Sequence, residues 1–213
     1  MTRFAVTCRD VQPDFYAAVP TLVFRLQLYE ATEVQVQAIL LRCQIRLEPA
    51  LRHYTTNEQR LLRDLFGEPE RWPETLQPLQ FAFVSQVVPS FRGRTMVELP
   101  VPCTYDFAVA SAKYCNLLET GTIPFLLLFS GTVFLEAPGG FTVEQFPWDV
   151  EARYRLPVST WQAMMDHYFP QSGWIRLSRE AIAALQRYKA EHALPTWEHT
   201  IESLLAVAGR GDR

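Results

Sequence analysis

The strongest constraint in this sequence is an alternation of apolar and polar side chains that runs, with one interruption, through residues 21–48. Every even position from 22 to 28 carries Leu or Phe, and a period of two residues is typical of a strand that buries one face. In residues 33–48 the apolar positions change from even to odd near Ala38, which predicts a β-bulge there or a strand that changes sheets. The simplest arrangement is a long antiparallel hairpin that opens a β-sandwich.

Further strands are predicted from shorter runs of the same kind. In one of them Pro100 and Pro102 restrict pairing, so this run fits the edge of a sheet or a crossing between sheets. Another run is apolar on both faces, as expected for a central strand, and the turn at residues 138–140 joins it to a partner in a second hairpin. The segments that we interpret as strands are 4–8, 81–88, 94–101, 125–136 and 141–146.

Helical spacing of apolar residues is the second periodic pattern in the sequence. Cap residues at 55–58 and a stop at Gly67 predict a short helix between them, and Trp72 is expected to anchor the proline-rich loop that follows. Ser159 and Gln162 have the spacing of a capping box. The remaining helices are predicted over 161–169, 178–194 and 196–208, and the segment 103–119 is expected to be a strand to about 109 and a short helix after it.

The order of these elements places strands first and helices last. This order predicts an α+β fold, with antiparallel β-sandwich-like sheets from the N-terminal two-thirds and two or three C-terminal helices packed against them. We expect a single domain over residues 1–208, β-rich over 1–157 and helical over 158–208, with a disordered tail at 209–213.

Charge and hydropathy exclude two classes of protein. The formal net charge of −3 supplies no broad cationic surface, so a nucleic-acid partner is not expected. The longest apolar run, residues 123–135, is 13 residues long and interrupted, whereas a spanning helix needs about 20. We therefore expect no membrane insertion. The first residues lack the apolar core of a secretory signal, and a cytoplasmic location follows.

The four cysteines are expected to be reduced core residues. Cys8, Cys43, Cys103 and Cys115 lie far apart, and no C-x-x-C spacing occurs, so they form neither a zinc motif nor a compact disulfide framework. Buried free cysteines behave as small apolar residues.

Motifs that carry chemistry are missing from the sequence. Neither G-x-G-x-x-G, G-x-x-x-x-G-K nor G-x-S-x-G occurs, and the four histidines lack H-x-x-x-H and H-x-H spacing. We expect no metal, no cofactor, no catalytic residue and no enzymatic activity. Asp106 and Lys113 are the only charges between Cys103 and Leu118. If buried they must pair, either as an acid/base pair or, as we favour, as a structural ion pair.

Three tryptophans recur at 13-residue intervals in a proline-bearing region: Trp148, Trp161 and Trp174. Tryptophan is enriched at the centres of protein interfaces, so these residues are candidates for partner binding. The alternative is that they fill the seam between helices and a sheet.

Several blocks give the chain a family resemblance. LPVPCTYDF at 99–107, the Lys113-Tyr114 pair, FSGTVF at 129–134, PWD at 147–149 and LFGEPERW at 65–72 resemble an uncharacterised bacterial family of unknown function, over about residues 4–205. The resemblance implies that members of the family are encoded beside high-affinity, oxygen-tolerant uptake [NiFe] hydrogenases. The role it implies is that of an accessory or assembly factor, with no catalytic residues carried over.

Three functional hypotheses follow. The first is a non-catalytic binding protein, in its leading version a [NiFe] hydrogenase maturation factor whose partner is a hydrogenase subunit or a maturation protein. The second is an enzyme or metal-handling protein that uses the segment Cys103–Lys113. The third, from layout alone, is a SecB-like chaperone that holds unfolded clients. The sequence does not indicate an oligomeric state.

Overall fold

A computed structural model describes residues 3–103, 109–170 and 177–209. The chain divides into two compact units, residues 1–171 and 172–213. In the described residues, the first unit holds the β-strands and the helices as far as α5 (Val158–Tyr168), and the second holds two helices. Whether the two units form a single domain stays a prediction.

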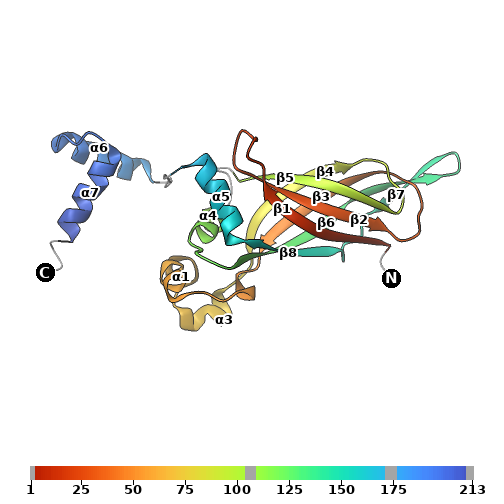
Figure 1. Ribbon diagram of the computed structural model, residues 1–213, viewed down its shortest axis with the longest axis horizontal. Coiled ribbons are helices and arrows are strands. Elements are labelled where there is room, and N and C mark those ends of the chain that lie inside the picture. The colour runs from red at the N-terminus through yellow and green to blue at the C-terminus, as the bar shows by residue number, and fades with distance from the viewer. Residues whose placement is uncertain (1–2, 104–108, 171–176, 210–213) are drawn as a thin grey trace. The chain divides into compact units, whose positions relative to one another are not determined.

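The first unit is built on two antiparallel sheets, as Figure 1 shows. The three-stranded sheet A has the order β1-β2-β5, and the five-stranded sheet B has the order β4-β3-β6-β7, with β8 paired to β6. The α+β class with two antiparallel sheets is confirmed. The strands are β1 (Phe4–Pro13), β2 (Thr21–Glu30), β3 (Val36–Leu47), β4 (Leu79–Val88), β5 (Arg94–Pro102), β6 (Thr122–Ala137), β7 (Gly140–Gln145) and β8 (Glu151–Pro157).

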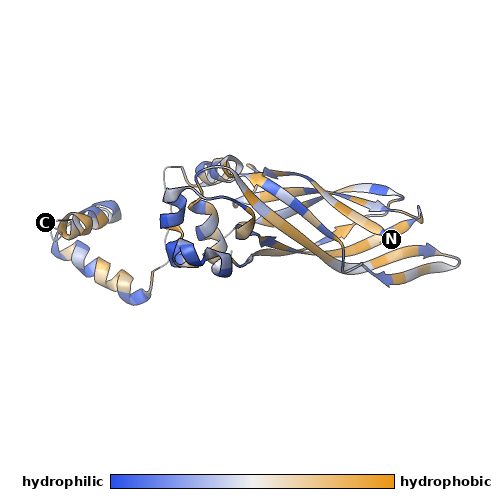
Figure 2. Ribbon diagram, turned by 90° about the horizontal axis from the view of Figure 1, so that it is seen from below, coloured by the Kyte–Doolittle hydropathy of each residue, from blue (hydrophilic) through white to orange (hydrophobic). Residues whose placement is uncertain are grey.

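The hydrophobic core fills the space between these sheets. The even positions 22–28 of β2 and the odd positions 39–47 of β3 are buried, so the alternation of the sequence directs one face of each strand inward. Stripes of hydrophobic and hydrophilic residues along the strands are visible in Figure 2. Phe24 of sheet A meets Phe125 of sheet B edge-on, with ring centroids 5.5 Å apart. Burial of one such side chain stabilises the fold by about 1.5–3 kcal/mol.

The predicted hairpin between the first two long strands is wrong. β2 lies in sheet A and β3 in sheet B, and the hairpin partner of β2 is β1. The chain crosses between the sheets directly after Glu30, whose buried carboxylate accepts hydrogen bonds from the backbone N–H groups of Thr32 and Val34. The change of phase is confirmed, because the pairing of β3 with β6 shifts register between Val36 and Ala38.

β6 is the central strand of sheet B, as predicted. It pairs with β3 along one side and with β8 and then β7 along the other. The hairpin of β6 with β7 is confirmed, and β5 is an edge strand, as its prolines indicated. The change of partner falls at Gly131, with a φ of 146°. A side chain at this position would collide with the carbonyl oxygen of Leu40, so glycine is required here.

The helices of the first unit lie at one end of the sandwich (Figure 1). Around Trp72 the structure has several short helices, where the sequence predicted one helix and a loop. Trp72 is buried, and its indole N–H donates to the carbonyl oxygen of Gly67. α5 packs against β1, β8 and α4. These elements are η1 (Pro49–Leu51), α1 (Thr56–Leu61), α2 (Arg63–Phe66), η2 (Pro69–Arg71), α3 (Trp72–Thr75), α4 (Val109–Asn116) and α5 (Val158–Tyr168).

One capping prediction is confirmed and another is wrong. Thr55 and Glu58 form a capping box at the start of α1. At α5 the helix already begins at Val158, after Pro157, and no side chain caps it. Gln162 instead donates a hydrogen bond from Nε2 to the carbonyl oxygen of Leu118, because its side chain faces the segment before β6.

The second unit is a helical hairpin of α6 (Arg179–Glu191) and α7 (Trp197–Ala208). Ser178 and Thr196 cap the two helices with side-chain hydrogen bonds, and the hydroxyl groups of Tyr188 and Ser203 lie 2.9 Å apart. Both helices were predicted. Residues 210–213 of the expected tail lie outside the described residues. Within the described chain, no helix has the length and apolar character that a membrane span requires.

Candidate binding surface

The three candidate tryptophans do not form one surface. Trp161 is 2% exposed, and its indole N–H donates to Oδ1 of Asn116 at 2.9 Å. Trp161 is a core residue of α5, so the prediction that it binds a partner is corrected. Trp148 is 89% exposed in the link between β7 and β8, and its role in binding stays a prediction. Trp174 lies outside the described residues.

Lys113 is not a buried charge. Its ammonium group pairs with the carboxylate of Asp64 on α2, and its side chain is 39% exposed. Asp106 lies outside the described residues, so its pairing with Lys113 stays a prediction. The sequence gave no sign that α2 would approach α4.

All four cysteines are free and buried, as predicted. Burial raises the pKa of the thiols of Cys8, Cys43 and Cys103 to about 12 and raises that of Cys115 well above its ordinary value. The thiolate is the nucleophilic and metal-binding form, so these thiols act as core side chains at neutral pH. In the described ranges, no three His, Cys, Asp or Glu residues are grouped to hold a metal ion.

Arg52 and Glu58 form an ion pair in the interior. Nη2 of Arg52 lies 2.7 Å from Oε1 of Glu58, and both side chains are almost fully buried. Arg52 also donates to the carbonyl oxygens of Thr120 and Thr122. Glu58 accepts the backbone N–H groups of Thr55 and Glu119. Burial raises the pKa of Glu58, but these hydrogen bonds and Arg52 outweigh burial and hold the pKa below its usual value.

Two tyrosines complete this polar centre. The hydroxyl of Tyr54 donates to the carbonyl oxygen of Pro49 at 2.7 Å and lies 2.9 Å from the hydroxyl of Tyr114. Burial raises the pKa of Tyr54 to about 12 and raises the pKa of Tyr114 as well, so both hydroxyls stay protonated at neutral pH. Every buried side-chain N or O atom in the described residues has a partner. The centre therefore connects the start of α1 to β6 and to α4.

The outward side of sheet B differs from this filled interior, because large apolar side chains are exposed on it. Phe83 is 73% exposed, Val87 58% and Leu40 48%, and Phe141 and Val143 are exposed at its β7 end. We call the outward surface of sheet B around these five residues the open face. The outward side of sheet A exposes fewer large apolar side chains, Tyr29 and Met96, and carries polar pairs such as Arg9 with Gln27 and Arg25 with Glu98.

A hollow of about 410 Å³ lies in the open face. The strand register places Ser85, Arg42 and Ser130 side by side on β4, β3 and β6. The two small serines flank the longer arginine, while Phe83 and Leu128 line the adjoining wall. The hollow thus offers one guanidinium and two hydroxyl groups beside apolar side chains.

The open face is also positively charged, although the whole chain has a net charge of −3. Arg46 of β3 and Arg153 of β8 lie opposite Leu126 on either side, and Arg155 lies opposite Pro124. With Arg42 these are four arginines, against the two outward glutamates of β6 and β8, Glu136 and Glu151. A positively charged surface attracts acidic partners. Sequence reasoning missed this face, because it requires knowing which strands are neighbours.

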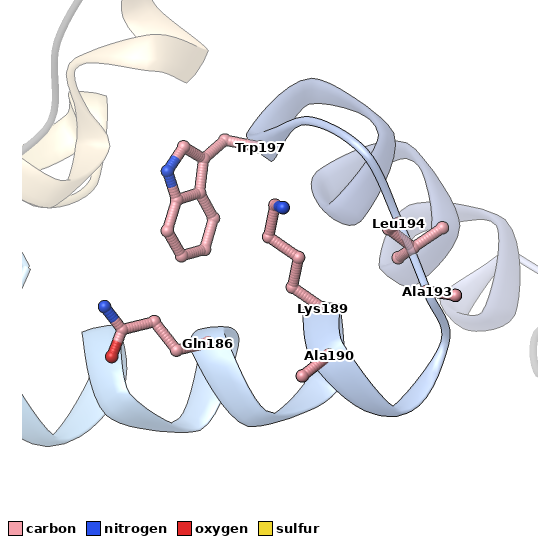
Figure 3. A pocket seen from close by; sticks show the side chains of 6 residues that line it. All are labelled: Gln186, Lys189, Ala190, Ala193, Leu194 and Trp197. Carbon is pink, nitrogen blue, oxygen red and sulfur yellow. The ribbon is translucent and has the colours of Figure 1, made fainter.

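A second hollow, of about 570 Å³, lies on the α6–α7 hairpin (Figure 3). Gln186, Lys189 and Trp197 line it together with Ala190, Ala193 and Leu194. The ammonium of Lys189 lies 5.9 Å from the centre of the Trp197 ring, which is a cation–π contact. The lining supplies no carboxylate, thiol or imidazole, so acid–base and nucleophilic chemistry are not favoured there.

Comparisons with known proteins show a family, and their matches to solved structures include weak likenesses. No curated protein matches the chain. A candidate late embryogenesis abundant (LEA) protein, solved in solution, is 13% identical over 72% of this chain and 70% of its own, with a TM-score of 0.32. A β-glucosidase from Kluyveromyces marxianus is 10% identical over 73% of this chain and 15% of its own, with a TM-score of 0.28. The family model DUF6084, a family of unknown function, matches residues 1–213, and the chain belongs to this family.

Proposed function

We propose that this chain is a non-catalytic binding protein whose open face docks an acidic, partly apolar surface of a partner protein. In the version that the family resemblance implies, it is a cytoplasmic assembly or maturation factor for a [NiFe] hydrogenase, and the partner is a hydrogenase subunit or another maturation protein. The observation that carries the docking proposal is the strong exposure of Phe83, Val87 and Leu40 on one sheet face.

Exposed apolar side chains in one patch are the usual mark of an interaction surface. A partner that covers Phe83 and Leu40 removes their apolar area from water, which contributes roughly 25 cal/mol per Å² before the costs of association. Arg42 in the hollow can pair with a carboxylate of the partner, and aromatic and arginine side chains dominate interface hot spots. Apolar contact would then supply affinity, while the arginines select an acidic partner.

The alternative of an enzyme or metal-handling protein in the segment Cys103–Lys113 has less support. Burial raises the pKa of the Cys103 thiol to about 12, so this thiol stays protonated at neutral pH. The Lys113 ammonium is already paired with Asp64. A SecB-like chaperone would use the same open face, but it would bind unfolded chains of many sequences rather than one folded partner.

The assembly role is tested by complementation in the native host. A strain that lacks the gene is supplied with the wild-type gene, with Leu40→Ser/Phe83→Ser, or with the control Tyr29→Ser/Met96→Ser, which alters exposed side chains of sheet A. We expect the wild type and the control to restore hydrogenase activity, and the open-face variant to fail at equal protein level. Unchanged hydrogenase activity in the deletion strain would contradict the assembly role.

A purified client separates docking from a chaperone role. Suppression of the aggregation of an unfolded client by the wild type, and its loss in Leu40→Ser/Phe83→Ser, would favour the chaperone. Absence of any suppression, together with binding of one folded hydrogenase component, is the result that docking requires.

A further inference from the structure

The open strand edges of the two sheets are not equally protected. An open edge exposes unpaired backbone groups, and proteins block such edges with prolines, charges, bulges or short strands. β5 contains Pro100 and Pro102, and β1 contains Pro13 and a bulge after Cys8. β7 is six residues long and begins with Gly140, and β8 carries three charges and ends in Pro157.

β4 has only one of these protections, a bulge at Phe81, where its pairing with β3 shifts register. Its ten residues, LQFAFVSQVV, include no charged residue, no proline and no glycine. In the described part of the chain β4 pairs only with β3, so its other edge has no hydrogen-bonded strand beside it, although β5 of sheet A lies close to β4. Antiparallel strands direct the backbone groups of alternate residues to the same side. About half of the N–H and C=O groups of β4 therefore point to this edge.

The first part of β4 is covered by α4. The hydroxyl of Ser111 on α4 donates to the carbonyl oxygen of Gln80. Residues 82–88 continue beyond this contact, and their outward side chains Phe83, Ser85 and Val87 are exposed. This leaves a segment of seven residues, long enough for a strand partner.

We propose that the free edge of β4 pairs with the same edge of a second copy of this chain. A two-fold axis perpendicular to the sheet places two identical edges side by side in antiparallel order, in which donors and acceptors match. The two sheets B then form one continuous sheet. This pairing does not depend on the proposed function, because it uses backbone edges rather than the outward side chains of the open face.

Charge favours a second copy as the occupant of this edge. Since β4 carries no charge, the two-fold axis brings no like charges together across the contact. The nearest outward arginine, Arg42, lies on β3, one strand further in. Three strand spacings of about 4.8 Å separate the two copies of Arg42, which exceeds the screening length of about 8 Å at physiological salt.

The test is the molar mass in solution, measured by analytical ultracentrifugation from about 5 to about 500 µM, because dimerisation depends on protomer concentration. We expect the wild-type chain to form a dimer over this range. In Ser85→Lys/Val87→Lys both substituted side chains are exposed, so the fold is retained while like charges meet at the contact. The dimer dissociation constant should rise at least about 30-fold.

The matched control is Tyr29→Lys/Met96→Lys, which adds the same charge to exposed positions of sheet A and should leave the dimer unchanged. Hydrogen exchange provides a second measurement, since amide groups at the free edge of residues 82–88 should be protected at high concentration and exchange faster on dilution. A wild-type chain that is monomeric throughout the range, or a dimer that survives Ser85→Lys/Val87→Lys, would overturn the proposal.

Discussion

Glu30 accepts a hydrogen bond of 2.6 Å from Nε of Arg3, and its carboxylate is fully buried at the point where the chain leaves sheet A for sheet B. Arg3 reaches further to Glu144 on β7, at 3.2 Å. One carboxylate thus connects the chain before β1, the crossing after β2 and, through Arg3, the edge of sheet B. The crossing replaces a hairpin, and Glu30 supplies the acceptors that its backbone N–H groups need.

Replacing Glu30 with Gln should destabilise the fold by about 2–4 kcal/mol, because an amide cannot accept all these hydrogen bonds and leaves Arg3 without a counter-charge. The measurement is urea unfolding at neutral pH. The control is Glu98→Gln, which removes the exposed pair with Arg25 and should cost no more than about 1 kcal/mol. Equal stability of the two variants would contradict the role of Glu30.

Stability should also fall in acid through Glu30 and Glu58. Burial raises the pKa of each carboxylate, but hydrogen bonds, together with Arg3 or Arg52, hold both pKa values below the usual range. A lowered folded-state pKa stabilises the fold fully above the unfolded value of about 4.3. The contribution is lost as the pH falls through the folded-state pKa. The unfolding free energy measured against pH should decline less steeply in Glu30→Gln than in the wild type.

Arg52→Met should destabilise the protein by about 3–5 kcal/mol, because it leaves the buried carboxylate of Glu58 without its cation. The double variant Arg52→Met/Glu58→Leu should recover part of this loss, since no uncompensated charge remains. The matched control Arg153→Met breaks the exposed pair with Glu151 and should change stability by less than about 1 kcal/mol. A double variant no more stable than the single one would mean that the helix cap, rather than the charge, sets the cost.

Trp161 and Trp148 should respond differently to alanine. Trp161→Ala removes a buried indole and should cost about 3–5 kcal/mol. Trp148→Ala alters an exposed side chain and should stay within about 0.5 kcal/mol of the wild type. Thermal unfolding of both variants checks this difference. A stable Trp161→Ala variant would show that the indole contributes little packing.

Gly131→Ala should destabilise sheet B by about 2–5 kcal/mol. The added methyl group would overlap the carbonyl oxygen of Leu40, and the φ of 146° is unfavourable for a side chain. Gly139→Ala is the control, because no atom lies within 4 Å of a side chain there, although its positive φ also strains alanine. The loss of stability should be clearly larger for Gly131→Ala than for Gly139→Ala. Similar losses would mean that backbone strain alone, and not the overlap with Leu40, destabilises the protein.

The period of the sequence predicted most strands because each sheet has one buried face. The even positions of β2 and the bulge near Ala38 could be located in this way. β8 was missed, although Ala152 and Leu156 are buried on one face, because it is short and carries three charges that face outward.

Pairing between strands could not be predicted, because the alternation is the same whichever strand lies alongside. The hairpin with β3 was therefore a reasonable but wrong choice for β2. The open face could not be predicted for the same reason, since Phe83, Leu40 and Arg42 come together only through the register of β3 and β4. Trp161 and Trp148 have the same residue type and regular spacing, and only the packing of α5 buries one and leaves the other exposed.

The most direct test of docking through the open face is affinity capture from the native host, with bound proteins identified by mass spectrometry. We expect the wild-type chain and Tyr29→Ser/Met96→Ser to retain a [NiFe] hydrogenase component. We expect Leu40→Ser/Phe83→Ser to lose it at unchanged melting temperature, and the retained amount to fall with rising salt. Capture of no hydrogenase component by the wild type, or equal capture by the open-face variant, would contradict docking of this partner through the open face.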